Sequence, residues 1–338
     1  MTVTNSTPAD KRGVLAIGNA IVDVLAQVDD GFLQQHGMNK AHMTLIDAER
    51  AEAIYAAMPA AKVRMSGGSA ANTAAGIAML GGAVRFVGRV RNDELGDAFS
   101  ADIRKIGVGF DTSPAQDGPA TARCLILVTP DAQRTMNTYL GACAQMTPED
   151  IDPAAIAAAQ VTYLEGYLWD QPHAKEAMRK AMRLTHEAGG KVAMTLSDAF
   201  CVERHRAEFQ HLVEHNIDIL FANESEIVSL YQTSDFDGAL QHVRDHVDVA
   251  ALTRSEKGSV ILAGQNVHII DAVPGVSVVD TTGAGDLYAA GFLHGYVDGF
   301  DLHACGRLGS LCAAEVISHV GARPQIDLKP FVAQALKG

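Results

Sequence analysis

The segment Val279-Asp280-Thr281-Thr282-Gly283-Ala284-Gly285-Asp286, near the end of a 338-residue chain, carries the most informative pattern of this sequence. Strand-like residues 276–279 lead into this segment, and an apolar stretch that predicts a helix follows it. Small residues at a helix start leave backbone N–H groups free, and these groups and the helix dipole attract an anion. We therefore predict an anion hole from three backbone N–H groups, those of Gly283, Ala284 and Gly285.

Asp286 lies in the first turn of the same predicted helix. Its carboxylate could simply cap the helix, or it could take a proton from a hydroxyl group that attacks a bound phosphate. The complete segment favours the catalytic role. The segment is not a P-loop, because GxxxxGK[ST] is absent, and it lacks the third glycine and the N-terminal position of a Rossmann fingerprint.

From residue 150 onward, predicted strands and helices alternate along the chain. Buried strands are predicted at 161–164, 191–196, 217–222, 249–253 and 259–263, and helices at 173–188, 203–215, 224–231, 236–245, 284–298 and 302–319. This alternation predicts an α/β fold with a doubly wound, mostly parallel sheet that has helices on both faces.

The first 140 residues contain strands that do not fit this alternation. Half-exposed strands are predicted between residues 20 and 47, and a β-hairpin that turns at Pro130-Asp131 is predicted within 117–143. We expect these two segments to form a small β-sheet lid inserted in one domain that spans 13–338. Residues 1–12 read as a flexible tail.

Charge and composition exclude several classes of function. The chain has 27 Lys and Arg against 40 Asp and Glu, a formal net charge of −13, and no long basic run, so nucleic-acid binding is not expected. Five widely spaced cysteines without a CxxC pair indicate a reducing compartment and no zinc site. The first apolar stretch is interrupted by Asn19 and Asp23, which argues against a signal peptide or membrane span. We expect a cytoplasmic protein.

Two further segments, together with the first, resemble the ribokinase / phosphofructokinase-B carbohydrate kinase family. Gly67-Gly68-Ser69-Ala70-Ala71-Asn72 is similar to the N-terminal substrate motif of that family, and Asn223-Glu224-Ser225-Glu226 to its Asn-x-x-Glu motif. The resemblance implies a ribokinase-like fold, ATP as donor, Mg²⁺ held through water by Glu226, and a catalytic Asp286. It also implies a set of nucleotide-binding residues: Asn223, Glu226, Thr253, Gly258, Thr282 and Gly285.

Within that family the sequence is most similar to the adenosine kinase branch, in Gly18-Asn19-Ala20-Ile21-Val22-Asp23 and in residues 195–200 and 220–224. That resemblance implies that Asp23 holds the two ribose hydroxyls of adenosine, since a carboxylate pairs strongly with vicinal hydroxyls. The other residues expected at the acceptor are Asn19, Gly67, Gly68, Ser69 and Asn72. The candidates for apolar contacts with the purine are Leu45, Leu140, Tyr167 and Phe200.

Three positions depart from the adenosine kinase pattern. Met43 stands where a polar residue is usual, Thr282 replaces the phenylalanine of Thr-Phe-Gly, and Arg91 replaces a lid glycine. A kinase for ribose, fructose or a related sugar is therefore the alternative, and a non-catalytic nucleoside- or nucleotide-binding regulator is a more distant one. The resemblance also allows K⁺ near the carbonyl groups of Asp280 and Thr282. The expected oligomeric state is a monomer or a homodimer.

Overall fold

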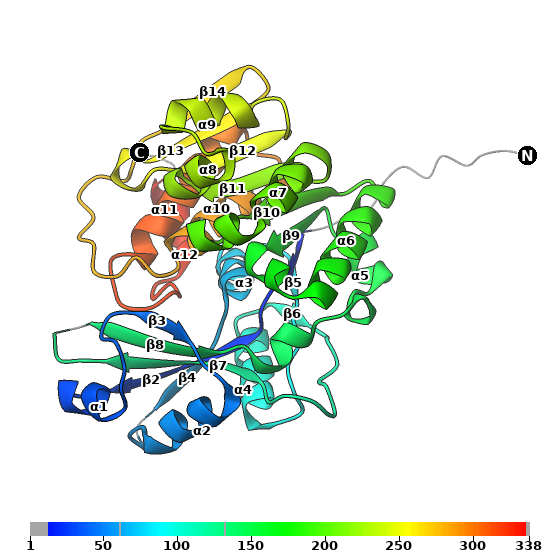
Figure 1. Ribbon diagram of the computed structural model, residues 1–338. Helices are drawn as coiled ribbons and strands as arrows, with labels where there is room; N and C mark the ends of the chain where they lie inside the picture. Colours follow the sequence, from blue (N-terminus) through cyan, green and yellow to red (C-terminus); the bar gives the residue numbers. More distant parts are fainter. Residues whose placement is uncertain (1–12, 61, 132, 336–338) are drawn as a thin grey trace, which may run out of the picture.

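The main body of the protein is a nine-stranded sheet (Figure 1) in the computed structural model, which describes residues 13–60, 62–131 and 133–335. The tail predicted at 1–12 lies outside these residues. The strand order is β14-β13-β12-β11-β10-β9-β1-β5-β6. In chain order the strands are β1 (Val14–Ile17), β5 (Val84–Val87), β6 (Gly109–Phe110), β9 (Val161–Glu165), β10 (Lys191–Thr195), β11 (Ile219–Asn223), β12 (Val249–Thr253), β13 (Ser259–Ala263) and β14 (Asn266–Ile270).

Helices cover both faces of this sheet, as predicted. One face packs on α3 (Ser69–Met79), α10 (Ala284–Val297), α11 (Leu302–Val316) and α12 (Leu328–Ala335); the other packs on α5 (Pro153–Ala158), α6 (Pro172–Glu187), α7 (Ala199–His215), α8 (Glu224–Tyr231) and α9 (Phe236–Val243). In β1 the side chain of Ala16 packs in the core on the face covered by α3 and α10. Leu15 and Ile17 pack in the core on the face covered by α6 and α7. This alternation places apolar side chains on both faces of a buried strand.

A second, five-stranded sheet lies beside the first, in the order β3-β8-β7-β2-β4. Its strands are β2 (Ile21–Gln27), β3 (Met43–Leu45), β4 (Val63–Gly67), β7 (Ala122–Val128) and β8 (Arg134–Tyr139). The antiparallel pair β7–β8 is the predicted hairpin. Three helices accompany this sheet: α1 (Asp30–Gln35), α2 (Ala48–Ala57) and α4 (Glu94–Lys105). Short 3₁₀ helices are η1 (Gly141–Gln145), η2 (Pro148–Asp150), η3 (Gly166–Asp170) and η4 (Ser255–Lys257).

The register of the small sheet determines which side chains share a face. Asp23 pairs with Cys124, Cys124 with Thr138, and Thr138 with Leu45, so these four residues lie on one face. Met43 and Arg134 lie on the same face, because each is an even number of residues from a member of that row. We call this the Asp23 face.

Three sequence expectations differ from the structure. No strand forms at 276–279; the backbone there is irregular, and Val279 N–H donates to the carbonyl of Ile317 instead. Strand β13 is antiparallel, because only five residues connect it to β12 and a parallel crossover needs many more. Strand β4 adds a fifth strand to the small sheet from outside the two segments predicted for it, and α4 was not predicted at all.

Candidate active site

Polar residues gather where the parallel strands of the large sheet end. Asn19 follows β1, Glu165 ends β9, Asn223 ends β11 and Thr253 ends β12. The carboxyl ends of parallel strands form one edge of a doubly wound sheet, and ligands of such folds bind at this edge. The fold therefore brings three of the predicted site residues, Asn19, Asn223 and Thr253, to one edge of the sheet.

Asp286 lies in the first turn of α10 and is held by side chains of α3. Its Oδ1 accepts a hydrogen bond of 2.6 Å from Ser69 Oγ, and its Oδ2 accepts one of 2.9 Å from Asn72 Nδ2. Thr73 Oγ1 donates to the Asp286 carbonyl at 3.1 Å. Burial raises the pKa of Asp286, although these hydrogen bonds and the charge of Arg323 oppose the rise. The result is an oriented carboxylate with a raised proton affinity, which suits a general base.

The loop before Asp286 has the conformation expected of an anion-binding helix start. Gly283 has φ +80°, and a side chain there would collide with Ala322. The N–H of Ala284 already donates to the carbonyl of Thr281 at 3.2 Å, whereas within the described chain the N–H groups of Gly283 and Gly285 have no protein acceptor. The space beside Gly285 is open. Two of the three predicted donors are thus free for an anion.

Arg134, which the sequence reading did not include, connects the small sheet to this loop. Its Nη1 donates to Asp280 Oδ2 and, at 3.2 Å, to Thr282 Oγ1. Burial alone would raise the pKa of Asp280, but hydrogen bonds from Thr282 and from Gly321 N–H, with the charge of Arg134, hold it below its usual range. Only the fold could reveal this contact, because Arg134 and Asp280 are 146 positions apart.

The Asp23 carboxylate lies next to Gly67, the first residue of the glycine motif. A side chain on Gly67 would meet the Asp23 carboxylate at 2.5 Å and push it aside, so the glycine leaves room for this carboxylate. Among the described residues no protein group donates a hydrogen bond to this carboxylate. Burial raises the pKa of Asp23 to about 6, although the nearby charges of Arg323 and Arg134 oppose the rise. A carboxylate with free acceptor positions is suited to bind hydroxyl groups of a ligand.

Asn19 and Gly68 pack against each other. Gly68 has φ +100°, and a side chain there would collide with the carbonyl of Asn19. The Asn19 side chain is buried and donates to Glu165 Oε1 at 2.6 Å. Asn19, predicted to contact the acceptor, therefore donates one N–H of its side-chain amide to Glu165.

Asn223 and Glu226 form a capping box at the start of α8. Glu226 Oε1 and Oε2 accept from Asn223 Nδ2 and Asn223 N, and Asn223 Oδ1 accepts from Glu226 N. Burial raises the pKa of Glu226 to about 7, and the charges of Asp198 and Asp286 add to the rise. No group of three or more His, Cys, Asp or Glu in the described chain could hold a metal ion directly.

Thr253 and Gly258 border the turn between β12 and β13. Gly258 has φ +78°, and its backbone lies against the carbonyl of Ile270, so no other residue fits there. Thr253 is partly buried at the strand end. Their neighbour Arg254 donates to Glu224 at 3.2 Å and lies over the ring of Phe236.

The candidate apolar residues divide into two groups. Leu45 is 59% exposed and Phe200 is 73% exposed, whereas Leu140 and Tyr167 are partly buried. The Tyr167 backbone N–H donates to Ser197 Oγ at 3.2 Å. Met43, on the Asp23 face with Leu45, is 53% exposed. Exposed apolar side chains near a site are available for ligand contact.

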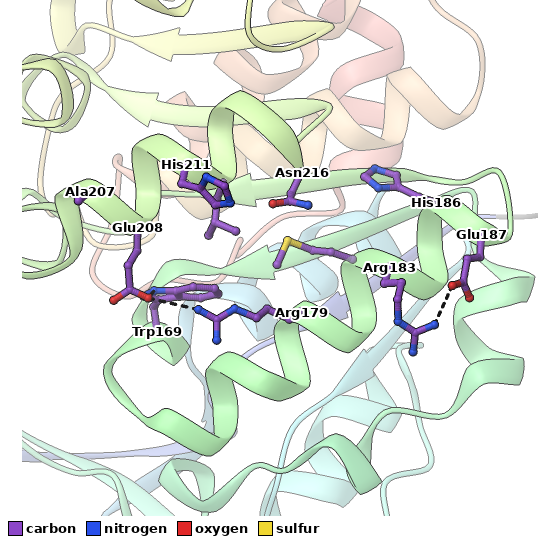
Figure 2. A pocket seen from close by; sticks show the side chains of 11 residues that line it. Trp169, Arg179, Arg183, His186, Glu187, Ala207, Glu208, His211 and Asn216 are labelled. Atoms are coloured by element: carbon purple, nitrogen blue, oxygen red, sulfur yellow. Dashed lines mark hydrogen bonds and ion pairs between the residues drawn. The ribbon is translucent and has the colours of Figure 1, made fainter.

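A cavity of about 630 Å³ lies elsewhere, between α6 and α7 (Figure 2). Its arginines are already paired: Arg179 with Glu208 at 3.5 Å and Arg183 with Glu187 at 2.7 Å. None of the predicted site residues lines it. We therefore place the site at the strand ends and not in this cavity.

Comparisons with known proteins match most of the chain. A family model described as pfkB family carbohydrate kinase matches residues 43–328. The structure of a probable sugar kinase protein from Rhizobium etli is 50% identical with a TM-score of 0.88, and that of adenosine kinase from Sinorhizobium meliloti is 51% identical with a TM-score of 0.87. Each alignment covers 96% of this chain and 99% of the other chain.

A relative of lower identity matches over nearly the same length. Adenosine kinase of Saccharomyces cerevisiae is 26% identical over 331 residues, which cover 91% of this chain and 95% of the yeast protein. No helix within the described residues is long and apolar enough to cross a membrane.

Proposed function

This chain belongs to the pfkB family of carbohydrate kinases, and we propose that it transfers the γ-phosphoryl group of ATP to the 5′-hydroxyl of adenosine, giving AMP and ADP. The membership confirms the family resemblance, the ribokinase-like α/β fold and a phosphotransferase with an alcohol group as acceptor. ATP as the donor follows from the family. The choice of adenosine as acceptor is the proposal.

The observation that carries this choice is the composition of the Asp23 face. It presents one carboxylate without a protein donor together with the exposed side chains of Leu45 and Met43. Vicinal hydroxyl groups of a ribose suit the carboxylate, and a purine ring suits the apolar side chains. A free sugar would leave Leu45 and Met43 in water. Phe200, at the start of α7, adds an apolar surface of the kind a purine ring stacks on.

Asp286 is proposed to act on the hydroxyl that attacks. Ser69 and Asn72 fix the carboxylate, which accepts the hydroxyl proton as the oxygen attacks the γ-phosphorus and the bond to the ADP oxygen breaks. The free N–H groups of Gly283 and Gly285 then stabilise negative charge on the transferred group. Arg134 holds Asp280 and Thr282, which shape this loop.

The residues around Glu226 fit a nucleotide-bound Mg²⁺. Burial and the charges of Asp198 and Asp286 raise the pKa of Glu226, and both of its oxygens already accept hydrogen bonds from Asn223. Glu226 would hold Mg²⁺ through water, as the sequence reading proposed, because a small divalent cation keeps several waters. When bound, Mg²⁺ neutralises charge on the phosphates of ATP. Thr253 and Gly258 would border the nucleotide.

A panel of acceptors tests the proposal. ADP release is measured with adenosine, guanosine, inosine, ribose and fructose at equal concentrations, with ATP and Mg²⁺ in excess. We expect the highest kcat/KM with adenosine. A higher kcat/KM with ribose or fructose would overturn the choice of acceptor and leave the family assignment in place.

A sugar kinase is the second candidate. The catalytic segment contains Thr282 where adenosine kinases commonly have phenylalanine, and the Rhizobium etli neighbour is described as a probable sugar kinase. Binding of ATP and of nucleosides with no turnover of any acceptor in the panel would instead support a non-catalytic regulator.

A further inference from the structure

Glu165 is a buried carboxylate beside the site that the proposed reaction does not use. It ends β9 in the middle of the large sheet and is 1% exposed. Its Oε1 accepts from Asn19 Nδ2 at 2.6 Å. Its Oε2 accepts from two backbone N–H groups, those of Ala70 at 2.9 Å and Asn19 at 3.3 Å.

These hydrogen bonds join two parts of the candidate site. Asn19 belongs to the connection from β1 to β2, the strand that carries Asp23. Ala70 lies in the first turn of α3, next to Ser69, and the same helix carries Asn72. One side chain therefore holds both the connection that leads into β2 and the start of α3, the helix that orients Asp286.

The packing leaves little freedom for this carboxylate. A side chain at Gly18 would collide with Glu165 Oε2 and with the Ala70 side chain. The ionisable groups that interact with Glu165 are Asp286 of α10, Cys143 of η1, Tyr163 of β9, Tyr167 of η3 and Cys201 of α7. None of these is a cation, and burial raises the pKa of Glu165 to about 7, against the three hydrogen bonds.

We propose that Glu165 is a positioning residue of the active site, which sets the connection at Gly18-Asn19 and the first turn of α3 so that Ser69 and Asn72 direct the Asp286 carboxylate at the acceptor hydroxyl. The proposal deepens the proposed function and rests on it for the role of Asp286. A carboxylate is required because both oxygens must accept. A glutamine offers one acceptor oxygen and an NH2 group with two donors, so either Asn19 Nδ2 or the two backbone N–H groups would face a donor instead of an acceptor.

The first test is the kinetics of Glu165→Gln, with Glu208→Gln as the matched control. Glu208 also accepts three hydrogen bonds, from Trp169 Nε1, Lys175 Nζ and Arg179 Nη2, but its helix α7 packs on the opposite face of the sheet. With the acceptor that the panel identifies, we expect Glu165→Gln to lower kcat about 10- to 100-fold and raise the acceptor KM, with the KM for ATP within about twofold. The control should leave all three constants unchanged.

A second variant guards against a folding defect. Gly18→Ala leaves Glu165 in the chain but forces its carboxylate to move, and it should reproduce the kinetic pattern of Glu165→Gln. Wild-type kcat and acceptor KM in Glu165→Gln would overturn the proposal. A loss of kcat that only follows the loss of folded protein, measured by thermal unfolding, would overturn it as well.

Amide hydrogen exchange separates this proposal from the proposed function. We expect faster exchange at Ala70 and its neighbours in Glu165→Gln and not in Glu208→Gln, because Ala70 N–H loses its acceptor. If the panel shows no turnover, the proposed function fails while the exchange measurement still decides whether Glu165 fixes this turn. Unchanged exchange would show that it does not.

Discussion

Ser69 Oγ donates a hydrogen bond of 2.6 Å to Oδ1 of Asp286, although the two residues are 217 positions apart in the chain. The serine and the asparagine of the glycine motif thus together hold the proposed base. The base is oriented before any acceptor binds. That arrangement lowers the cost of reaching the reactive geometry.

Asp286→Asn should lower kcat by about 10²- to 10⁴-fold, the usual contribution of a general base. The amide keeps the shape of the carboxylate but cannot take a proton, so the KM for ATP should change little. Steady-state ADP release measures both constants. Asp298→Asn, at the other end of α10, is the control and should retain wild-type kcat. Turnover of Asp286→Asn near the wild-type rate would contradict the assignment.

Asp23→Asn should stabilise the protein without ligand at pH 7. The pKa of Asp23 is about 6 in the folded protein against a usual 3.8, so the folded state binds more protons between about pH 4 and 6. The free energy of unfolding therefore falls as pH rises through this window. We expect a gain of about 1–2 kcal/mol for Asp23→Asn at pH 7, discounted because Asp23 is partly exposed.

Thermal unfolding at pH 5 and pH 7 checks this expectation. The difference between wild type and Asp23→Asn should shrink at the lower pH, where the wild-type carboxyl group is mostly protonated. The exposed Asp117→Asn is the control and should show no such pH dependence. A variant less stable than wild type at pH 7 would mean that the Asp23 carboxylate has a stabilising partner.

Arg323→Met should weaken acceptor binding at low pH. Arg323 Nη2 donates to Ser66 O at 2.7 Å, and its charge is the largest influence that lowers the pKa of Asp23. Without it the Asp23 pKa rises, so the acceptor KM should begin to increase at a higher pH. A rise of one pKa unit would shift the KM profile by about one pH unit.

The control for this variant makes the same contacts elsewhere. Arg206 also donates to a serine carbonyl and hydroxyl, those of Ser229, but between α7 and α8. Arg206→Met should leave the KM profile unchanged, and Arg323→Lys should restore part of it because the charge remains. An unshifted profile in Arg323→Met would show that the charge does not act on Asp23.

The sequence predicted the parts of this site that a local pattern encodes. The segment ending at Asp286, the glycine motif and Asn223-Glu226 each combine turn or cap residues within a few positions. Contacts made by the fold could not be predicted in this way. Arg134 reaches Asp280 across 146 positions, and Arg323 reaches Ser66 across 257, with no spacing rule that connects them.

The strand predictions show the same limit. Buried strands with continuous apolar runs, such as β9 and β11, were placed to within two residues. Strand β4 was missed because its five residues show no apolar alternation: Val63 and Arg64 are exposed, whereas Ser66 and Gly67 are buried. It exists through its pairing with β2. Residues 276–279 carry valines that favour strands, but no neighbouring strand pairs with them.

The contact between Arg134 and Asp280 should couple the small sheet to the loop that precedes Asp286. Both side chains are 11% exposed, so removing one partner leaves a buried charge unpaired. We expect Arg134→Met and Asp280→Asn each to lower kcat/KM for ATP. The double variant should be no worse than the more impaired single one, with a coupling energy of about 1–3 kcal/mol in the double-mutant cycle. Additive losses would show that the two residues act independently.

Phe200→Ala distinguishes a purine acceptor from a free sugar. Phe200 is 73% exposed at the start of α7, and a ring that a nucleoside covers on binding contributes about 1.5–3 kcal/mol. The KM for adenosine should therefore rise about 10- to 100-fold, whereas any activity with ribose should be unchanged. Phe300→Ala, at an exposed turn after α10, is the control. Equal losses with adenosine and ribose would mean that Phe200 supports the site as a whole and does not contact the base.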